Sequence, residues 1–394
     1  MKLIRGARIY CPYCYEEISR RQAWFRCTGP VSRGGQRCVP EIDPVLRDRT
    51  GFGGAVPPAF AADGRKDSAV CPTCQGETTI RICPVCHSRL PVHFGKLGNR
   101  LIVPVGAKES GKTVFMTVLV HELMHQAGQQ FNAAITGADE HTRQRFASDY
   151  ERPLYRQARL LAPTTGHQAP LVFRFTTERH RPLNGRLGGP GDPQRTLLSF
   201  FDTAGEDLRS QQSIEQNVRY LGAADGIVLL LDPLQMGGAR ELAAPDARLP
   251  DLSEDEPATV LENVTELLLS SQGGRPNKRI GKPLAIVFTK MDTLMHDLKE
   301  TSPLRQSPPQ RQYFDERDSL GVHTEIQRLL ARWDGIRIDQ FAQHHYSKYR
   351  YFGVSALGET PTADNRVSAR GIRPYRVASP ILWVLAQFGI IPVK

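Results

Sequence analysis

The chain has 394 residues, of which 40% are hydrophobic and 23% charged, and its formal net charge is +10. This composition indicates a globular protein with a sizeable core, and the length allows two or three domains. Residues 1–10 lack the apolar core of a signal peptide, and the longest apolar stretch, 381–393, is too short to span a bilayer. We therefore expect a cytoplasmic protein without a membrane span.

All eight cysteines lie near the start of the chain, and six of them form three Cys-Pro-x-Cys pairs. Such a pair can place both sulfurs on one tetrahedral ion, so the pattern in a reducing compartment indicates metal rather than disulfides. If eight thiolates hold two divalent ions, the formal charge falls from +10 to +6. The expected ligands of two Zn²⁺ ions are Cys11, Cys14, Cys27, Cys38, Cys71, Cys74, Cys83 and Cys86.

Two assignments of these cysteines to the two ions are considered. The sequential arrangement is preferred because it closes shorter loops: the first four cysteines bind one ion, and the last four form a compact zinc ribbon. In the interleaved arrangement, the first pair joins the third and the second joins the fourth. His87 is a further candidate ligand that neither arrangement needs.

Residues 1–97 are predicted to form a small zinc-binding domain. The Gly-, Pro- and Arg-rich segment 28–68 fits a flexible loop, so zinc would supply most of the order. A protein-docking role is preferred because no base-reading helix pattern is present. Nucleic-acid binding is the alternative, supported by arginines and aromatic residues in this region: Arg5, Arg8, Arg20, Arg21, Arg26, Arg33, Arg37, Tyr10, Tyr13, Tyr15, Trp24 and Phe25.

A P-loop pattern follows the zinc module. An apolar run at 101–105 leads into Gly-x-x-x-x-Gly-Lys-Thr, and residues 114–124 favour a helix. Backbone N–H groups of such a loop and the helix start together bind phosphate. Lys112 would bridge the β- and γ-phosphates, and Thr113 would ligate Mg²⁺. The expected phosphate-binding residues are Gly106, Lys108, Glu109, Ser110, Gly111, Lys112, Thr113 and Val114.

A helix at 139–161 and a hairpin of strands at 171–177 and 196–201 are expected next. The second strand ends in Asp202-Thr-Ala-Gly205-Glu206. An acidic residue at the end of a buried strand suits a Mg²⁺-bound water, and the glycine N–H can meet a γ-phosphate.

Strands and helices alternate in the rest of the chain, with strands expected at 226–232, 284–288 and 351–354. Helices are expected at 213–223, 259–270, 322–333 and 380–388, and two polar inserts near 233–257 and 299–317, the second one mobile. This alternation predicts an α/β fold for residues 98–394, a doubly wound sheet with its site at the carboxyl ends of the strands.

Four sequence elements occur in the order found in the small P-loop GTPases of the Ras, Rab and Arf type, which the chain resembles from about residue 99 onward. The resemblance implies a six-stranded sheet with one antiparallel hairpin, GTP or GDP with Mg²⁺, and a switch driven by γ-phosphate contacts. The zinc-ribbon leader and the insert also resemble bacterial double-GTPase-type proteins of conflict systems. The four elements are Gly106–Thr113, Asp202–Gly205, Thr289–Asp292 and Ser355–Leu357.

The resemblance also assigns roles at the base end of the nucleotide. Asp292 would accept from the guanine N1–H and amine, Lys290 would pack over the base, and the Ala356 N–H would meet guanine O6. A carboxylate at this place repels the acceptor edge of adenine, which gives guanine selectivity a physical reason. The residues implied at this end are Thr289, Lys290, Asp292, Ser355, Ala356 and Leu357.

Departures from the family pattern predict slow hydrolysis without a partner. Glu206 stands where a glutamine orients water, and Lys108 occupies a glycine position that an activating arginine would approach. A third departure concerns the base: Thr289 replaces the usual asparagine, which predicts the loss of one hydrogen bond and of some guanine preference. The switch threonine is expected at Thr164 or Thr165, and Arg159 is a candidate internal arginine finger. The residues expected to act in hydrolysis are Lys112, Thr113, Thr164, Thr165, Gly205 and Glu206.

A competing motif lies in the helix after the P-loop, where His121-Glu122-Leu-Met-His125 reads H-E-x-x-H, as in zinc proteases. At 100° per residue the apolar residues of this helix share one face, and the histidines lie roughly opposite, toward solvent. Phe131 stands where an extended protease motif would have a third histidine. The metalloprotease is therefore the remote alternative to a GTPase.

Overall fold

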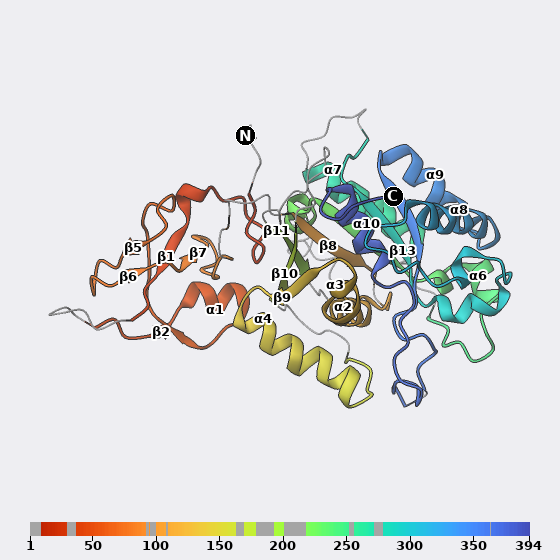
Figure 1. The fold of residues 1–394 in the computed structure, drawn as a ribbon, viewed down its shortest axis with the longest axis horizontal. Coiled ribbons are helices and arrows are strands. Elements are labelled where there is room, and N and C mark those ends of the chain that lie inside the picture. Colours follow the sequence, from red (N-terminus) through yellow and green to blue (C-terminus); the bar gives the residue numbers. More distant parts are fainter. Residues whose placement is uncertain are drawn as a thin grey trace, which may run out of the picture.

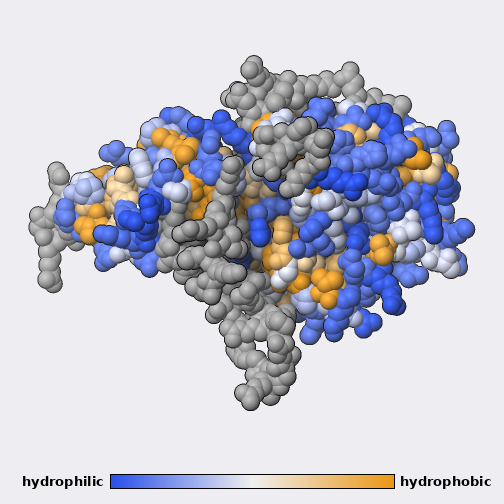
Figure 2. Space-filling view, turned by 90° about the horizontal axis from the view of Figure 1, so that it is seen from above, coloured by the Kyte–Doolittle hydropathy of each residue, from blue (hydrophilic) through white to orange (hydrophobic). Residues whose placement is uncertain are grey.

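The computed structural model describes residues 9–29, 37–91, 94, 100–107, 109–162, 169–178, 193–200, 218–251, 256–271, 279–362 and 364–394. The molecule is elongated: a small N-terminal module lies at one end, and a larger α/β domain forms the rest (Figure 1). On the face shown in Figure 2, hydrophilic residues predominate and the apolar residues form small separate patches. Among the described residues, no helix has the length and apolar character needed to cross a membrane.

The α/β domain is built on a seven-stranded sheet in the order β14-β13-β12-β8-β11-β10-β9. Strands β14 to β11 in this order run parallel, and β10 pairs antiparallel with both β11 and β9. The strands are β8 (Leu101–Gly106), β9 (Ala133–Gly137), β10 (Leu171–Glu178), β11 (Pro193–Phe200), β12 (Gly226–Leu231), β13 (Leu284–Phe288) and β14 (Tyr349–Gly353).

Helices cover both faces of this sheet, because successive side chains of a strand point to opposite sides. Val228 and Leu230 of β12 pack with α2, η3 and α10, whereas Ile227 and Leu229 pack with α7, α8 and α9. The predicted α/β class and doubly wound sheet are therefore confirmed. These helices are α2 (Lys112–Glu122), η3 (Phe146–Arg156), α7 (Pro257–Ser271), α8 (Glu316–Arg332), α9 (Ile336–His345) and α10 (Ser379–Gln387).

Shorter helical segments connect these elements. The π-helical turn η2 continues α2 without a break, and α4 in the same way continues into the π-helical η3. Residues 218–223, the described part of the helix expected at 213–223, are helical. The remaining segments are η2 (Leu123–Ala127), α3 (Gly128–Gln130), α4 (Glu140–Arg145), η5 (Pro233–Gln235), α6 (Gly237–Glu241), η6 (Met291–Asp297) and η7 (Pro303–Arg305).

The sheet has one strand more than the six that the family resemblance implies. Strand β9 adds to the outer edge of β10, where Ile135 pairs with Phe175. The excursion expected to be mobile at 299–317 is also partly packed, because Leu304 is fully buried and Phe314 is only 6% exposed. The prediction that this segment is a mobile surface excursion was therefore wrong at Leu304 and Phe314.

The N-terminal module consists of short strands around one helix. Strand β1 pairs with β4 and β7, β2 pairs with β3, and β5 pairs with β6. The segment expected to be a flexible loop contains α1, which Asp43 caps through its carboxylate and Gly51 ends in a left-handed conformation. The elements are η1 (Arg20–Gln22), β1 (Trp24–Arg26), β2 (Glu41–Ile42), α1 (Pro44–Thr50), β3 (Ala55–Val56), β4 (Ala59–Phe60), β5 (Ala69–Val70), β6 (Glu77–Thr78) and β7 (Arg81–Ile82).

Candidate functional site

The P-loop joins β8 to α2, as the sequence predicts. A Cβ atom at Gly106 would lie 2.6 Å from the Ser110 hydroxyl oxygen and 3.0 Å from the Leu230 carbonyl oxygen, so only glycine fits there. Gly111 caps α2 with a φ of 79°, and Glu109 has a φ of 62°. This left-handed geometry turns the chain sharply before Lys112, the first residue of the helix.

Ser110 and Thr289 connect the P-loop to the strand ends beside it. The Thr289 hydroxyl donates to the carbonyl oxygens of Ser110 (2.9 Å) and Leu231 (3.2 Å). The Ser110 hydroxyl is buried and has no hydrogen-bond partner among the described residues. A buried polar group without a partner is costly, and a phosphate oxygen would satisfy it.

Lys290 and Asp232 form an ion pair at the ends of β13 and β12. The Lys290 ammonium lies 2.5 Å from an Asp232 carboxylate oxygen, and the Asp232 side chain is 3% exposed. Lys290 has a left-handed backbone with a φ of 54°. Sequence reasoning missed Asp232, although an acid that follows a buried strand is the signal that singled out Asp202.

Asp292 borders a cavity of about 260 Å³ beside the strand ends. The Ser355 hydroxyl donates to its carboxylate over 2.5 Å and accepts from the Gly358 N–H over 2.8 Å. Burial raises the pKa of Asp292, although the Ser355 hydrogen bond acts in the opposite direction. The cavity is also lined by residues that the sequence did not point to, which are Met295, Arg305, Arg373 and Tyr375.

The structure brings together the P-loop, the Thr289–Asp292 segment and Ser355 at the carboxyl edge of the parallel strands. Val114, Ala356 and Leu357 are partly buried and pack against the core on the α2 side of the sheet. Lys112 and Thr113 start α2. Arg159 is exposed, and its backbone pairs with that of Arg366. The predicted residues Lys108, Thr164, Thr165, Asp202, Gly205 and Glu206 lie outside the described part of the chain.

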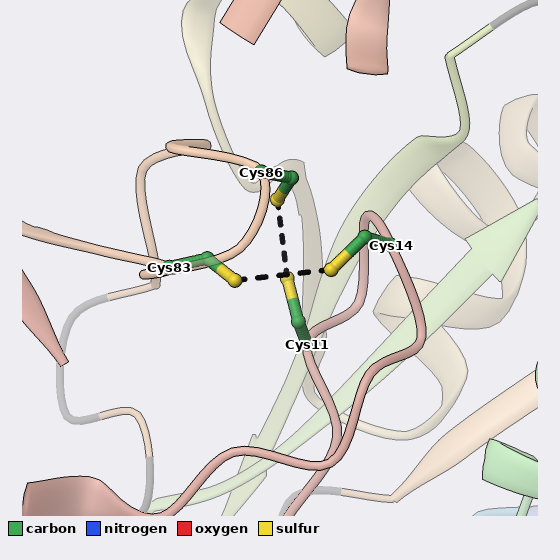
Figure 3. A group of neighbouring side chains, drawn as sticks. All are labelled: Cys11, Cys14, Cys83 and Cys86. Carbon is green, nitrogen blue, oxygen red and sulfur yellow. Dashed lines mark hydrogen bonds between the residues drawn. The ribbon is translucent and has the colours of Figure 1, made fainter. Parts of the chain in front are cut away.

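The cysteines form two clusters, and both predicted pairings are wrong. The first Cys-Pro-x-Cys pair joins the last one, and the middle four cysteines form the second cluster. The arrangement is therefore nested, neither sequential nor interleaved, because antiparallel pairing of β1 with β7 brings the two ends of the module together. The proximal cluster consists of Cys11, Cys14, Cys83 and Cys86 (Figure 3), and the distal cluster of Cys27, Cys38, Cys71 and Cys74.

Both clusters have the dimensions of a tetrahedral thiolate site. A Zn–S bond of about 2.3 Å places sulfurs about 3.8 Å apart. The Sγ atoms of Cys11 and Cys86 are 3.7 Å apart, and those of Cys38 and Cys71 are 3.8 Å apart. His87 belongs to neither cluster, and its Nδ1 lies 2.9 Å from an Asp43 carboxylate oxygen.

The three Cys-Pro-x-Cys turns share one backbone geometry. The residue after each pair, Tyr15, Gln75 or His87, has a φ between 55° and 60° and donates its N–H to the carbonyl of the first cysteine. Burial raises the pKa of the Cys71 thiol, but N–H donors from Cys74 and Thr73 lower it more, to about 7. At Cys71 the turn thus favours the thiolate form that a metal needs.

A family model matches the α/β domain. The model for Double-GTPase 2 matches residues 100–347. The chain belongs to this family. The predicted resemblance to P-loop GTPases is thereby confirmed, and the α/β domain is a GTPase-type domain.

Relatives and solved structures were also found for this chain. "Putative ESX-1 scaffolding and assembly protein SaeC" of Mycolicibacterium smegmatis is 29% identical and aligns with 97% of this chain and 99% of its own length. The signal recognition particle receptor SRb-GTP/SRX complex of Chaetomium thermophilum matches 68% of this chain and 94% of that chain, with 15% identity and a TM-score of 0.30. The Arl6 BBS3 small GTPase of Trypanosoma brucei matches 73% and 96%, with 11% identity and a TM-score of 0.29.

The proximal cluster is packed onto the sheet of the Double-GTPase domain. Cys11, Cys83 and Cys86 lie in one apolar cluster with Val172 of β10 and Leu197 of β11. Side chains in and next to the Cys11–Cys14 turn extend this contact with the α/β domain. The Tyr15 hydroxyl lies 2.9 Å from the Ser199 hydroxyl, Arg219 pairs with Glu16, and the Tyr13 hydroxyl donates to Asp139.

The distal cluster has its own small core with Phe25 and Phe60 and stands apart from the sheet. Several residues that favoured nucleic-acid binding are used inside the module. Arg26 is 8% exposed and pairs with Asp43, and Tyr13, Tyr15 and Phe25 are buried. Buried rings cannot stack on bases, so the structure weakens this alternative.

Proposed function

We propose that this Double-GTPase protein binds GTP with Mg²⁺, hydrolyses it slowly and docks a protein partner through its zinc-loaded N-terminal module. The observation that carries the nucleotide half is the Thr289 hydrogen bond to Ser110, which joins the two ends of one site. The match to a Double-GTPase family supports the same assignment.

At the phosphate end, the P-loop N–H groups and the Ser110 hydroxyl would receive phosphate oxygens. Lys112 would bridge the β- and γ-phosphates, and Thr113 with Asp202 would hold Mg²⁺, which neutralises the charge that develops during phosphoryl transfer. Gly205 would donate its N–H to the γ-phosphate. Glu206 can accept from the attacking water but cannot donate to phosphate, which supports slow turnover.

At the base end, Asp292 is held in place before any ligand arrives. Ser355 donates to one carboxylate oxygen, and the carboxylate would accept from the guanine donors. Lys290 is oriented by Asp232 and would lie over the base. Because this carboxylate is partly buried, its hydrogen bonds to the guanine donors would be stronger than in water.

In the N-terminal module each cysteine cluster would bind one Zn²⁺, since the sulfur spacing fits tetrahedral coordination. The proximal ion would anchor the module to the sheet and the distal ion would order the outer part. The name of the mycobacterial relative supports a scaffolding role for this chain as well, with the distal part facing a protein partner.

The decisive test is fluorescent GTP binding with Mg²⁺, competed by GTP, GDP and ATP. We expect GTP and GDP to compete and ATP to fail, and Lys112→Ala to bind at least about tenfold more weakly. Lys299→Ala changes an exposed lysine remote from the P-loop in sequence and serves as the control. Equal competition by ATP overturns guanine selectivity, and full binding by Lys112→Ala overturns the P-loop assignment.

Hydrolysis and partner docking need separate measurements. Phosphate release in a single turnover should be slower than about one per second without a partner. A partner should be captured by the intact protein and lost in a Cys38→Ser and Cys71→Ser variant that keeps GTP binding. Capture that survives loss of the distal cluster would place the docking surface elsewhere.

A further inference from the structure

A third group of metal-binding side chains lies on the outer side of the P-loop helix. The donor atoms of His121, His125 and Glu151 all lie within 4.8 Å of one another. His121 Nδ1 is 3.0 Å from a Glu151 carboxylate oxygen, and the two imidazole rings are 4.3 Å apart between centroids. None of these residues belongs to the nucleotide site or to the cysteine clusters.

Two helical segments supply this group. His121 stands at the end of α2 and His125 in η2, whereas Glu151 belongs to η3, which continues α4 and contacts α2. The switch from α- to π-helical geometry falls between the two histidines, and such irregular turns are common at functional sites. The Tyr155 ring stacks on His121 at 3.8 Å and fixes its orientation.

The group is accessible and does not serve the core. Phe115, Leu119 and Leu123 are buried on the face opposite the histidines, and Val118, one turn earlier on the histidine side, is buried as well. The side chains of His121 and Glu151 are 25% and 32% exposed, and His125 is exposed. An ion can therefore reach all three donors from solvent.

The donor set selects a particular class of ion. Two imidazoles with one carboxylate suit Zn²⁺ and similar transition metals, and three protein ligands leave a position open for water. Nitrogen and oxygen ligands of one Zn²⁺ stand about 3.3 Å apart, so small side-chain rotations would close the set. A hydrogen bond between His121 and Glu151 already holds two ligands at 3.0 Å.

We propose that His121, His125 and Glu151 form a third, open zinc site that joins the P-loop helix to η3. Both histidines of the H-E-x-x-H motif would be ligands of this site. The third ligand would be Glu151 from another helix and not the motif glutamate. Glu122 lies outside the group. The proposal concerns metal binding, not peptide hydrolysis.

Zinc stoichiometry tests the proposal on the full chain, free of any affinity tag and dialysed against Zn²⁺. We expect three ions per chain in the wild type, one for each group of donors, and two in His125→Ala. His125 is exposed, so its truncation should leave the fold intact. Glu151→Gln is the second variant and should also bind two ions. Unchanged circular dichroism without added zinc verifies folding.

Two controls separate this site from adventitious binding. His344→Ala removes another exposed histidine, and Glu122→Gln removes the motif glutamate; both should keep three ions. Cobalt gives a second readout, because Co²⁺ at this site lacks the sulfur charge-transfer absorption of the cysteine clusters. Two ions in the wild type, or a third ion that persists in both His125→Ala and Glu151→Gln, overturns the proposal, as does loss of that ion in Glu122→Gln.

Discussion

The hydroxyl of Thr289 donates to the carbonyl oxygen of Ser110 over 2.9 Å, and this bond connects the segment Thr289–Asp292 directly to the P-loop. Threonine at this place therefore keeps a link between the two ends of the site. The sequence comparison with Ras-like proteins suggested the loss of a hydrogen bond here. The observed contact shows that the shorter side chain still reaches the loop.

Thr289→Val should weaken nucleotide binding by about fivefold. Valine has nearly the same shape but removes the hydroxyl donor to the Ser110 carbonyl, at a cost of about 1 kcal/mol, whereas the Leu231 carbonyl keeps the Thr289 N–H as its donor. Fluorescent GTP titration measures the effect. Thr265→Val is the matched control, because that buried hydroxyl bonds within α7 and to Tyr346. Equal affinities in both variants would contradict a role for the Thr289 bond.

Asp292→Asn should weaken GTP binding by at least about tenfold, because a charge-assisted hydrogen bond contributes about 1.5–3 kcal/mol. The amide offers one donor in place of an acceptor, so xanthosine triphosphate, which carries a carbonyl in place of the guanine amine, should bind better than GTP. Competition titration compares the two nucleotides. Asp297→Asn, in the same η6 segment and paired with Arg332, is the control. A variant that keeps its preference for GTP would remove Asp292 from base recognition.

The same substitution should stabilise the nucleotide-free protein at neutral pH. Burial raises the pKa of Asp292 above its ordinary value of 3.8, so the ionised carboxylate lowers the free energy of unfolding at pH 7. The penalty grows as pH rises through the raised pKa and vanishes at pH values below the ordinary one. Thermal midpoints from pH 7 down to about 4 should show a gain for Asp292→Asn that shrinks with falling pH. A constant difference would argue against a titration of this group.

His323 should make the protein sensitive to acid. Burial and the nearby Arg350 lower the pKa of His323 to about 4, and its Nδ1 accepts from the Tyr351 N–H. Since the unfolded state binds the proton more readily, stability is complete above the ordinary pKa of 6.5 and is lost as pH falls toward 4. His323→Asn keeps an acceptor but does not titrate, so its thermal midpoint should fall less steeply. If the thermal midpoints of the wild type and of His323→Asn fall in parallel with pH, protonation of His323 is not the cause of the acid sensitivity.

The nested cysteine arrangement can be tested by double substitutions. Cys14→Ser with Cys83→Ser removes two ligands of one cluster and should cost one zinc ion, whereas Cys14→Ser with Cys71→Ser should cost both cysteine-bound ions. Zinc content by mass spectrometry measures the outcome. The distal ion should stay in place in the Cys14→Ser single variant and in the Cys14→Ser, Cys83→Ser double variant. Under the sequential pairing, Cys14 and Cys83 would belong to different ions, and that double variant would lose both.

Sequence patterns predicted the parts of the fold that depend on local signals. Strand β13 was placed at its observed residues because five apolar residues in a row are typical of a strand buried on both faces. Strand β9 was missed, since its alternating small residues carry little signal and its pairing with β10 is a tertiary event. The cysteine pairing was wrong for the same reason: loop length favours neighbours, but the β1–β7 contact determines which pairs meet.

The candidate site shows a similar division. Motif residues such as Lys112 and Asp292 can be proposed from the sequence because phosphate and base chemistry constrain their spacing. Arg305 and Arg373 line the cavity beside Asp292 but come from the short helical turn η7 and from a loop, neither of which carries a motif. Glu151 was missed because it meets His121 only across two helices. Contacts between separate elements need the folded chain.

Because the two clusters are nested, the segment that carries the distal cluster is inserted between the two cysteine pairs of the proximal cluster. The chain leaves the sheet after Cys14, builds the distal cluster and returns at Cys83. During synthesis the distal cluster can fill once Cys74 is made, before the proximal one has its last ligand. Over evolution, the segment between Cys14 and Cys83 can be exchanged or lengthened while both of its ends stay fixed at the proximal cluster. Under the proposed docking role, this segment could be adapted to a new partner without a change in the sheet that carries the P-loop.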